Sequence, residues 1–107
     1  MGEADLKRLL ATLRREFMAV LGDQFDRMLL YGSRARGDGQ AASDIDVLVV
    51  VRGEFDYGDL IERTSPIVCA LSLEHDVVIS RAFVEKERFE REGSPFLLNV
   101  RREGVAV

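Results

Sequence analysis

The segment from Asp44 to Val51, DIDVLVVV, constrains the fold more than any other part of the chain. It begins with the alternation of polar and apolar side chains that is typical of a β-strand, and its last five residues are all apolar. A strand that is apolar on both faces belongs in the middle of a covered sheet. The sequence therefore predicts an α/β (α+β) protein in which this segment is a central strand.

Hydrophobic spacing and turn residues divide the remaining chain into further elements. We expect a helix over about 4–21, a strand over 28–31, a helix over about 60–71, a strand over 76–84, a charged helical turn or two over 85–92, and a helix that begins after Ser94 and ends at Gly104. Pro66 lies inside the second helical pattern, where it either kinks the helix or separates two short ones. Cys69 lies in the apolar stripe of that pattern, and we expect it in the core. The main elements follow the order α-β-β-α-β-α.

The connections predict how the three strands pair. One short loop joins the first two strands, which favours an antiparallel pair, whereas a helix joins the second and third, which favours a parallel crossover. The sheet is then small and mixed. This topology brings the end of the first strand, the start of the second and the start of the third to one edge of the sheet. Gly32 and Ser33, the acids Asp44 and Asp46, and Asp76 would meet there.

Composition limits the class of protein. The 107 residues suit a single domain over 1–107, and the formal net charge of −4 argues against tight general binding of nucleic acid. One cysteine and one histidine can form neither an internal disulfide nor a Cys/His zinc site. No apolar run approaches the roughly 20 residues that span a bilayer, and the acidic N-terminal residues do not resemble a signal peptide. We therefore expect a cytoplasmic protein.

Asp44 and Asp46 are the strongest candidates for chemistry. They are two residues apart on a strand, so both side chains point to the same face, where two like charges repel. A divalent cation between them would remove the conflict, and magnesium commonly binds one or two carboxylates together with phosphate oxygens. The alternative is a pair of exposed acids at the mouth of the strand. The pair alone leaves both interpretations open.

The segment after the first strand favours a phosphate ligand. Gly32 has no side chain and can adopt a positive φ, so Gly32 and the Ser33 hydroxyl can approach a phosphate closely. Arg34 and Arg36 follow and can bind phosphate oxygens. The segment lacks the Gly-Lys-Ser/Thr of a P-loop. Alone it could be a flexible surface loop, but Asp-x-Asp follows ten residues after the serine, and this combination is more specific than either half.

The stretch GSRARGDGQAASDIDVLVV resembles the GS-x10-D-x-D signature of the nucleotidyltransferase superfamily with the DNA polymerase beta-like fold. In length, the chain is most similar to the minimal nucleotidyltransferases of bacteria and archaea. The resemblance implies that Gly32 and Ser33 hold the phosphates of a nucleoside triphosphate, with ATP as the substrate. It implies that Asp44 and Asp46 bind Mg²⁺, with two ions expected. A third carboxylate on a neighbouring strand completes such sites, and Asp76 is the candidate, with Glu74 as the fallback.

The resemblance also implies a reaction and a partner. A hydroxyl would attack the α-phosphorus and release pyrophosphate, with two metal ions neutralising charge. Members of the minimal group pair with a small helical HEPN-type toxin and act as antitoxins by transferring AMP to one of its tyrosines. The acceptor would otherwise come from a second copy of this chain. One alternative is a binding module that neutralises its partner by contact alone, and another, less favoured, is transfer to a small molecule.

Overall fold

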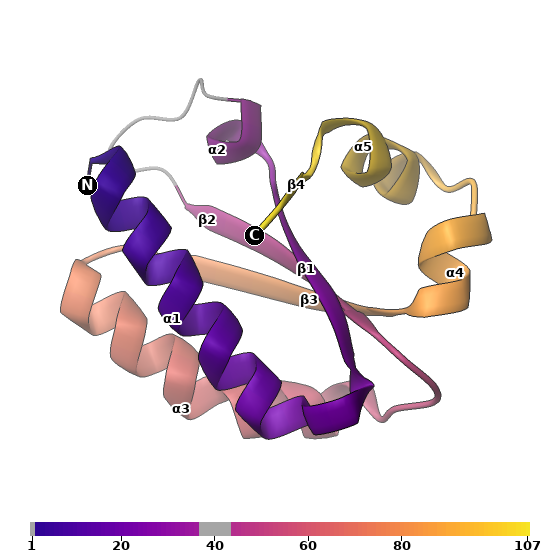
Figure 1. Cartoon of the computed structure of the whole chain (residues 1–107), viewed down its shortest axis with the longest axis horizontal. Helices are drawn as coiled ribbons and strands as arrows, with labels where there is room; N and C mark the ends of the chain where they lie inside the picture. Colours follow the sequence, from indigo (N-terminus) through magenta and orange to yellow (C-terminus); the bar gives the residue numbers. More distant parts are fainter. Residues whose placement is uncertain (1, 37–43) are drawn as a thin grey trace.

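The computed structural model describes residues 2–36 and 44–107, and at Ser33 and Arg36 it describes the backbone alone. Figure 1 shows the arrangement of the elements. They are α1 (Glu3–Leu21), a 3₁₀ turn η1 (Gly22–Gln24), β1 (Phe25–Tyr31), α2 (Ser33–Arg36), β2 (Ile45–Val51), α3 (Tyr57–His75), β3 (Ile79–Glu85), α4 (Lys86–Arg91), α5 (Pro95–Glu103) and β4 (Val105–Ala106). No helix in the described ranges is both long and apolar enough to cross a membrane.

The strands form one mixed sheet in the order β3-β2-β1-β4. The predicted pairings are confirmed, since β1 and β2 are antiparallel and β2 and β3 are parallel. The short strand β4, which was not predicted, adds to the free edge of β1 in antiparallel orientation. The prediction that the third strand starts at Asp76 is wrong, because β3 begins only at Ile79. The helix before it continues to His75, and the chain needs the intervening residues to turn back onto the sheet.

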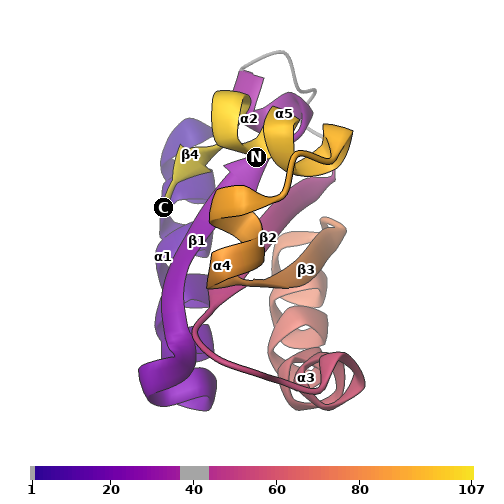
Figure 2. The ribbon, with the colours of Figure 1, turned by 90° about the vertical axis from the view of Figure 1, so that its right-hand side faces the viewer.

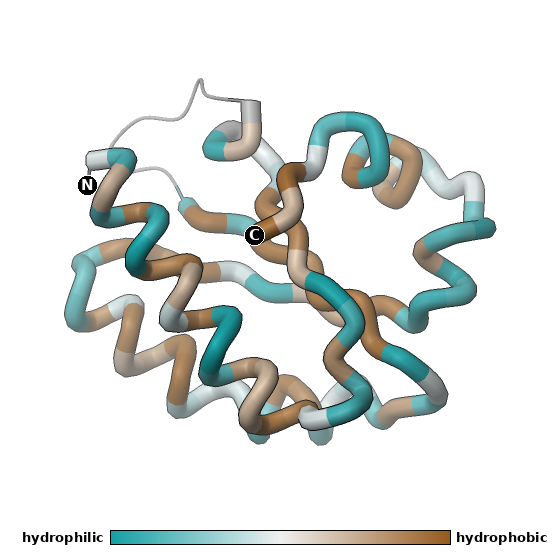
Figure 3. The backbone as a smooth tube through the Cα atoms, in the orientation of Figure 1, coloured by the Kyte–Doolittle hydropathy of each residue, from teal (hydrophilic) through white to brown (hydrophobic). Residues whose placement is uncertain are grey.

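Helices cover both faces of the sheet, as the apolar pattern of β2 requires (Figures 1 and 2). The long helices α1 and α3 lie on one face, where Leu13, Phe17 and Val49 belong to the main core. The shorter α4 and α5 lie on the other face, where Phe89 and Leu97 pack against Leu48 in a second, smaller core. In Figure 3 the hydrophobic colour runs along the crossing strands, while α1 alternates between hydrophobic and hydrophilic turns.

A single helix, α3, runs through Pro66, so the segment is not divided into two short helices. Side-chain donors gather on the carbonyls that precede the proline. The Ser65 hydroxyl donates to the carbonyl of Ile61 at 2.7 Å, and the Arg81 guanidinium of β3 donates to the same carbonyl at 2.8 Å. These bonds stabilise the helical turn just before the proline, which itself lacks the N–H that would bond to the carbonyl of Glu62. Cys69 is exposed on α3, so the prediction that it lies in the core is wrong.

Candidate active site

Gly32 directly follows β1 and has a conformation that glycine adopts readily, with φ of 76°. A Cβ atom at this position would lie 2.6 Å from Oδ2 of Asp46. The carboxylate therefore occupies the space that a side chain on residue 32 would fill. The predicted meeting of the glycine with the Asp-x-Asp pair is confirmed for Gly32 and Asp46.

Strand register places Asp46 in the middle of a row of three polar side chains. Its Cα partner on β1 is Tyr31, and its Cα partner on β3 is Ser80. Residues paired in this way project to the same face of a sheet, so Tyr31, Asp46 and Ser80 all lie on the face covered by α5. Asp46 is half-buried, whereas Asp44, just before β2, is exposed. The site is thus a shallow, polar row at the sheet edge where the predicted motifs meet.

The two acids lack positive partners within the described part of the chain. Among residues 2–36 and 44–107, no side chain forms a hydrogen bond or ion pair with Asp44 or Asp46. Burial, and then the negative charge of Asp44, raises the pKa of Asp46 above its usual value. Two carboxylates that repel and lack a counter-charge are suitable ligands for a divalent cation, because Mg²⁺ prefers oxygen donors. The residues present therefore fit a magnesium ion held by Asp44 and Asp46.

Tyr31 closes the site on the β1 side. Its ring packs edge-on against Phe96 of α5, with centroids 5.4 Å apart, and a cavity of about 170 Å³ opens beside the two rings and Gly32. Burial raises the pKa of the Tyr31 hydroxyl, with further contributions from the charge of Asp46 and from Tyr57. The phenol thus stays neutral next to the carboxylate.

A groove of about 350 Å³ lies farther along the same face. Leu48 and Ala82, the residues two positions beyond Asp46 and Ser80, contribute to it, and Tyr57 and Phe96 add aromatic rings. Tyr57 and Phe96 are also among the exposed large hydrophobic side chains. The polar row therefore adjoins an apolar groove.

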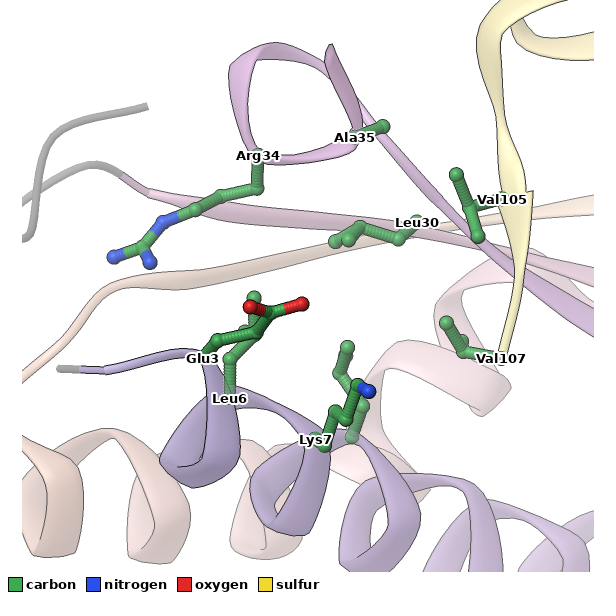
Figure 4. A pocket seen from close by; sticks show the side chains of 9 residues that line it. Glu3, Leu6, Lys7, Leu30, Arg34, Ala35, Val105 and Val107 are labelled. Carbon is green, nitrogen blue, oxygen red and sulfur yellow. The ribbon is translucent and has the colours of Figure 1, made fainter. Parts of the chain in front are cut away.

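Arg34 lies on the opposite side of the sheet from Asp46. Figure 4 shows its side chain extending from α2 over the N-terminal end of α1, where it lines a groove of about 460 Å³ with Glu3, Leu30 and Val107. Leu30 packs in the core beneath α1, on the face that Asp46 does not share. The predicted contacts of Ser33 and Arg36 with phosphate fall on side chains outside the description. Phosphate binding by these three residues stays a prediction.

Asp76 does not lie where the sequence analysis expected it. It follows α3 with a left-handed φ of 52°, is exposed, and comes three residues before β3 begins. Glu74 is on the last turn of α3 and lines a groove with Thr12 and Glu16 of α1, on the other face of the sheet. The described residues hold no group of three or more His, Cys, Asp or Glu side chains suited to a metal ion. A three-carboxylate site with Asp76 is therefore not confirmed.

The strand position beside Asp46 is occupied by Ser80, which the sequence analysis missed. The residue that follows Ser80, Arg81, points the other way and bonds to Ser65 and Ile61 of α3. The alternation of β3 thus assigns Ser80 to the site and Arg81 to the helix. Only the register of β3 against β2 shows this, and the sequence pattern alone does not fix it.

Comparison with known families decides what kind of protein carries this site. The family model of the nucleotidyltransferase domain matches residues 12–102. The chain belongs to the nucleotidyltransferase domain family. Two proteins of Methanocaldococcus jannaschii support the assignment. "Putative protein adenylyltransferase MJ0141" is 30% identical over 82 residues, covering 77% of this chain and 82% of that protein. "Putative protein adenylyltransferase MJ0604" is 33% identical over 95 residues, covering 84% and 89%.

Solved structures show the same fold. The structure of "a putative nucleotidyltransferase from Sulfolobus solfataricus" superimposes with a TM-score of 0.58 at 19% identity, covering 99% of this chain and 87% of that one. A toxin–antitoxin structure with AMP-PNP gives 0.56 at 20% identity, covering 88% and 68%. A mutant of the toxin–antitoxin MntA-HpeT gives 0.57 at 19% identity, covering 100% and 72%. The nucleotidyltransferase thus has the mixed α/β fold expected from its sequence.

Proposed function

We propose that this nucleotidyltransferase depends on magnesium and transfers AMP from ATP to a tyrosine hydroxyl of a small helical HEPN-type toxin, which it thereby neutralises. The observation that carries the proposal is the contact between Gly32 and the half-buried Asp46 carboxylate. It joins the phosphate-binding half of the motif to the metal-binding half in one place. Asp44 and Asp46 would hold the magnesium ion, and Gly32 and Ser33 would hold the phosphates.

The chemistry is a displacement at the α-phosphorus. The acceptor oxygen forms a bond to that phosphorus, the bond to the bridging oxygen breaks, pyrophosphate leaves, and the phenolic proton is lost to solvent. Asp44 and Asp46 would hold a magnesium ion there, which would supply positive charge to neutralise the phosphates. The chain itself would supply two fixed carboxylates and a backbone free of side-chain atoms at Gly32, so that phosphate oxygens can approach.

Three observations support a protein acceptor. The relatives from M. jannaschii carry the name of protein adenylyltransferases, and two of the solved structures with this fold are toxin–antitoxin pairs. In addition, the apolar groove with Tyr57 and Phe96 lies on the face of the sheet that carries Asp46, where an aromatic acceptor side chain can pack.

A second candidate is neutralisation by contact alone. The observation that favours it is Ser80, because the strand position beside Asp46 offers a neutral hydroxyl instead of a third carboxylate. A site with fewer carboxylates activates an attacking hydroxyl less strongly. The protein would then still bind the toxin, and a nucleotide could remain bound without transfer.

Incubation with ATP labelled at the α-phosphate, magnesium and the helical protein encoded by the adjacent gene tests both candidates. We expect label on the partner with the wild-type chain and with Asp5→Asn, a matched change of an exposed acid on α1. Asp46→Asn should abolish labelling and leave the fold intact. Full neutralisation of the toxin by Asp46→Asn, without any labelling, would support the contact-only candidate and contradict AMP transfer.

A further inference from the structure

Ser80 is the β3 residue nearest to Asp46 along the ladder. The two are Cα partners in a parallel pair, and neighbouring strands lie roughly 4.8 Å apart. Ala82 and Val84 continue the same side of β3 and pack with Leu48 in the second core, so Ser80 projects to the face that carries Asp46. Ser80 is exposed, and its hydroxyl is accessible to a ligand bound at Asp46.

No described acid takes the place of Ser80. Asp76 lies beyond the end of α3, where its left-handed backbone turns the chain, and Glu74 lies on the other face of the sheet. A further acid, Glu103 of α5, lines the cavity beside Tyr31 and Gly32 on the β1 side of Asp46, whereas Asp44 and Asp46 belong to the segment that pairs with β3. Their two negative charges match one divalent cation. A second cation on the β3 side of Asp46 would have only a neutral hydroxyl as its additional protein ligand, and a hydroxyl is a weaker ligand for Mg²⁺ than a carboxylate.

We propose that Ser80 restricts the site to one tightly bound divalent cation for each nucleotide, in place of the two expected from the sequence. This inference rests on the proposed function, since it takes the site to bind magnesium and a nucleoside triphosphate. It also deepens that function. Without a second ion to lower the pKa of the attacking group, the site suits an acceptor that ionises easily. A phenol, with an ordinary pKa of about 10, ionises far more easily than water.

The experiment counts ions directly, without relying on turnover. The folded protein is saturated with a non-hydrolysable ATP analogue, and bound Mn²⁺ is measured by electron paramagnetic resonance and equilibrium dialysis. We expect one tight ion in the wild type and a second in Ser80→Asp, with an affinity at least about tenfold higher than any weak second ion of the wild type. Ser80→Asn, which has a similar shape without charge, should keep a single ion. Asp76→Asn should leave the count unchanged.

Different failures point to different errors. Two tight ions in the wild type, or loss of an ion in Asp76→Asn, would overturn the role of Ser80 while the proposed function stands. A folded Ser80→Asp that gains no ion would do the same. If the wild type binds no Mn²⁺ with the analogue, and Asp46→Asn changes nothing, the proposed function itself fails and this inference fails with it.

Discussion

Replacing Gly32 with alanine tests the contact on which the site depends. The chain provides a matched control, because Gly32 and Gly53 have almost the same φ, 76° and 79°. A Cβ at Gly53 would meet no atom within 4 Å, whereas a Cβ at Gly32 would meet the Asp46 carboxylate at 2.6 Å. Both substitutions place a side chain on a backbone with a positive φ. Only Gly32→Ala must also displace Asp46.

The magnitudes follow from these two contributions. A left-handed conformation costs a residue with a side chain roughly 1–2 kcal/mol, partly offset by about 0.4–1 kcal/mol from the stiffer unfolded chain. We therefore expect Gly53→Ala to lower the free energy of unfolding by about 1 kcal/mol. Gly32→Ala must in addition shift the end of the Asp46 side chain from its rotamer, at a cost of about 0.5–1.5 kcal/mol. Because 1 kcal/mol shifts the Tm of a domain of this size by roughly 4–8 °C, the two variants should be easy to distinguish.

The assay is urea unfolding of both variants, repeated in an Asp46→Ala background. Removing the carboxylate should lower the cost of Gly32→Ala to that of Gly53→Ala. Affinity for the ATP analogue with Mn²⁺ should fall at least about tenfold in Gly32→Ala and stay unchanged in Gly53→Ala. A loss of stability in Gly32→Ala no greater than that in Gly53→Ala, or an extra loss that persists without Asp46, would contradict a steric contact between residue 32 and the carboxylate.

Three further predictions concern stability. Asp46→Asn should stabilise the metal-free protein at pH 7, because the raised pKa of Asp46 means that its ionisation favours the unfolded chain. This gain in the free energy of unfolding should vanish below pH 3.8, the ordinary carboxyl pKa, and urea unfolding at pH 7 and below pH 3.8 measures it. Burial alone would raise the pKa of Asp26, but hydrogen bonding and attraction from Arg27, then Lys86 and Arg52, hold it below its usual value; the stability that Asp26 contributes is therefore present above pH 3.8 and lost as the pH falls through the lowered pKa. Asp26→Asn should lower the free energy of unfolding by about 1–3 kcal/mol at pH 7, and by more than Asp5→Asn, whose ion pair with Arg8 is exposed; equal losses in chemical denaturation would contradict this. Arg81→Ala should cost about 2 kcal/mol or more in the wild type and less in a Pro66→Ala background, where α3 is regular; a double-mutant cycle without coupling would show that the guanidinium does not support the helix at the proline.

The sequence predicts the central part of the fold because β2 carries an unambiguous pattern. Five consecutive apolar residues require cover on both faces, and the short and long connections then determine which neighbour is antiparallel and which is parallel. The sequence pattern does not predict the strand β4. Val105–Ala106 is too short to show a period, and the edge of β1 holds it by pairing and by the hydrogen bond from the Val107 amide to the Met28 carbonyl.

The candidate site could be predicted only as far as spacing determines it. Gly32 and the Asp-x-Asp pair come together because Gly32 follows β1, the pair lies at the start of β2, and β1 and β2 are antiparallel neighbours. The residue at the position expected for a third carboxylate depends on where α3 ends and β3 begins. Val77 falls on the same face as Ile79 and Phe83, so the pattern extends the strand back to Asp76, although the backbone there belongs to the helix end. Because β3 begins three residues later than the pattern indicates, the β3 residue that pairs with Asp46 is Ser80, and Asp76 lies outside the strand.

The register of β1 against β2 is the physical link between the core and the site. The ladder runs from Phe25↔Val51 to Tyr31↔Asp46, and its far end is the pair that flanks the contact with Gly32. A slip of one residue would turn Asp46 to the face covered by α1 and α3 and would move Val47, Val49 and Val51 out of the main core into the second core. The buried valines of β2 therefore fix the carboxylate at the sheet edge. Because that end of the ladder faces solvent, the two acids can repel each other there at a small cost to the fold, and a cation that binds them removes that cost.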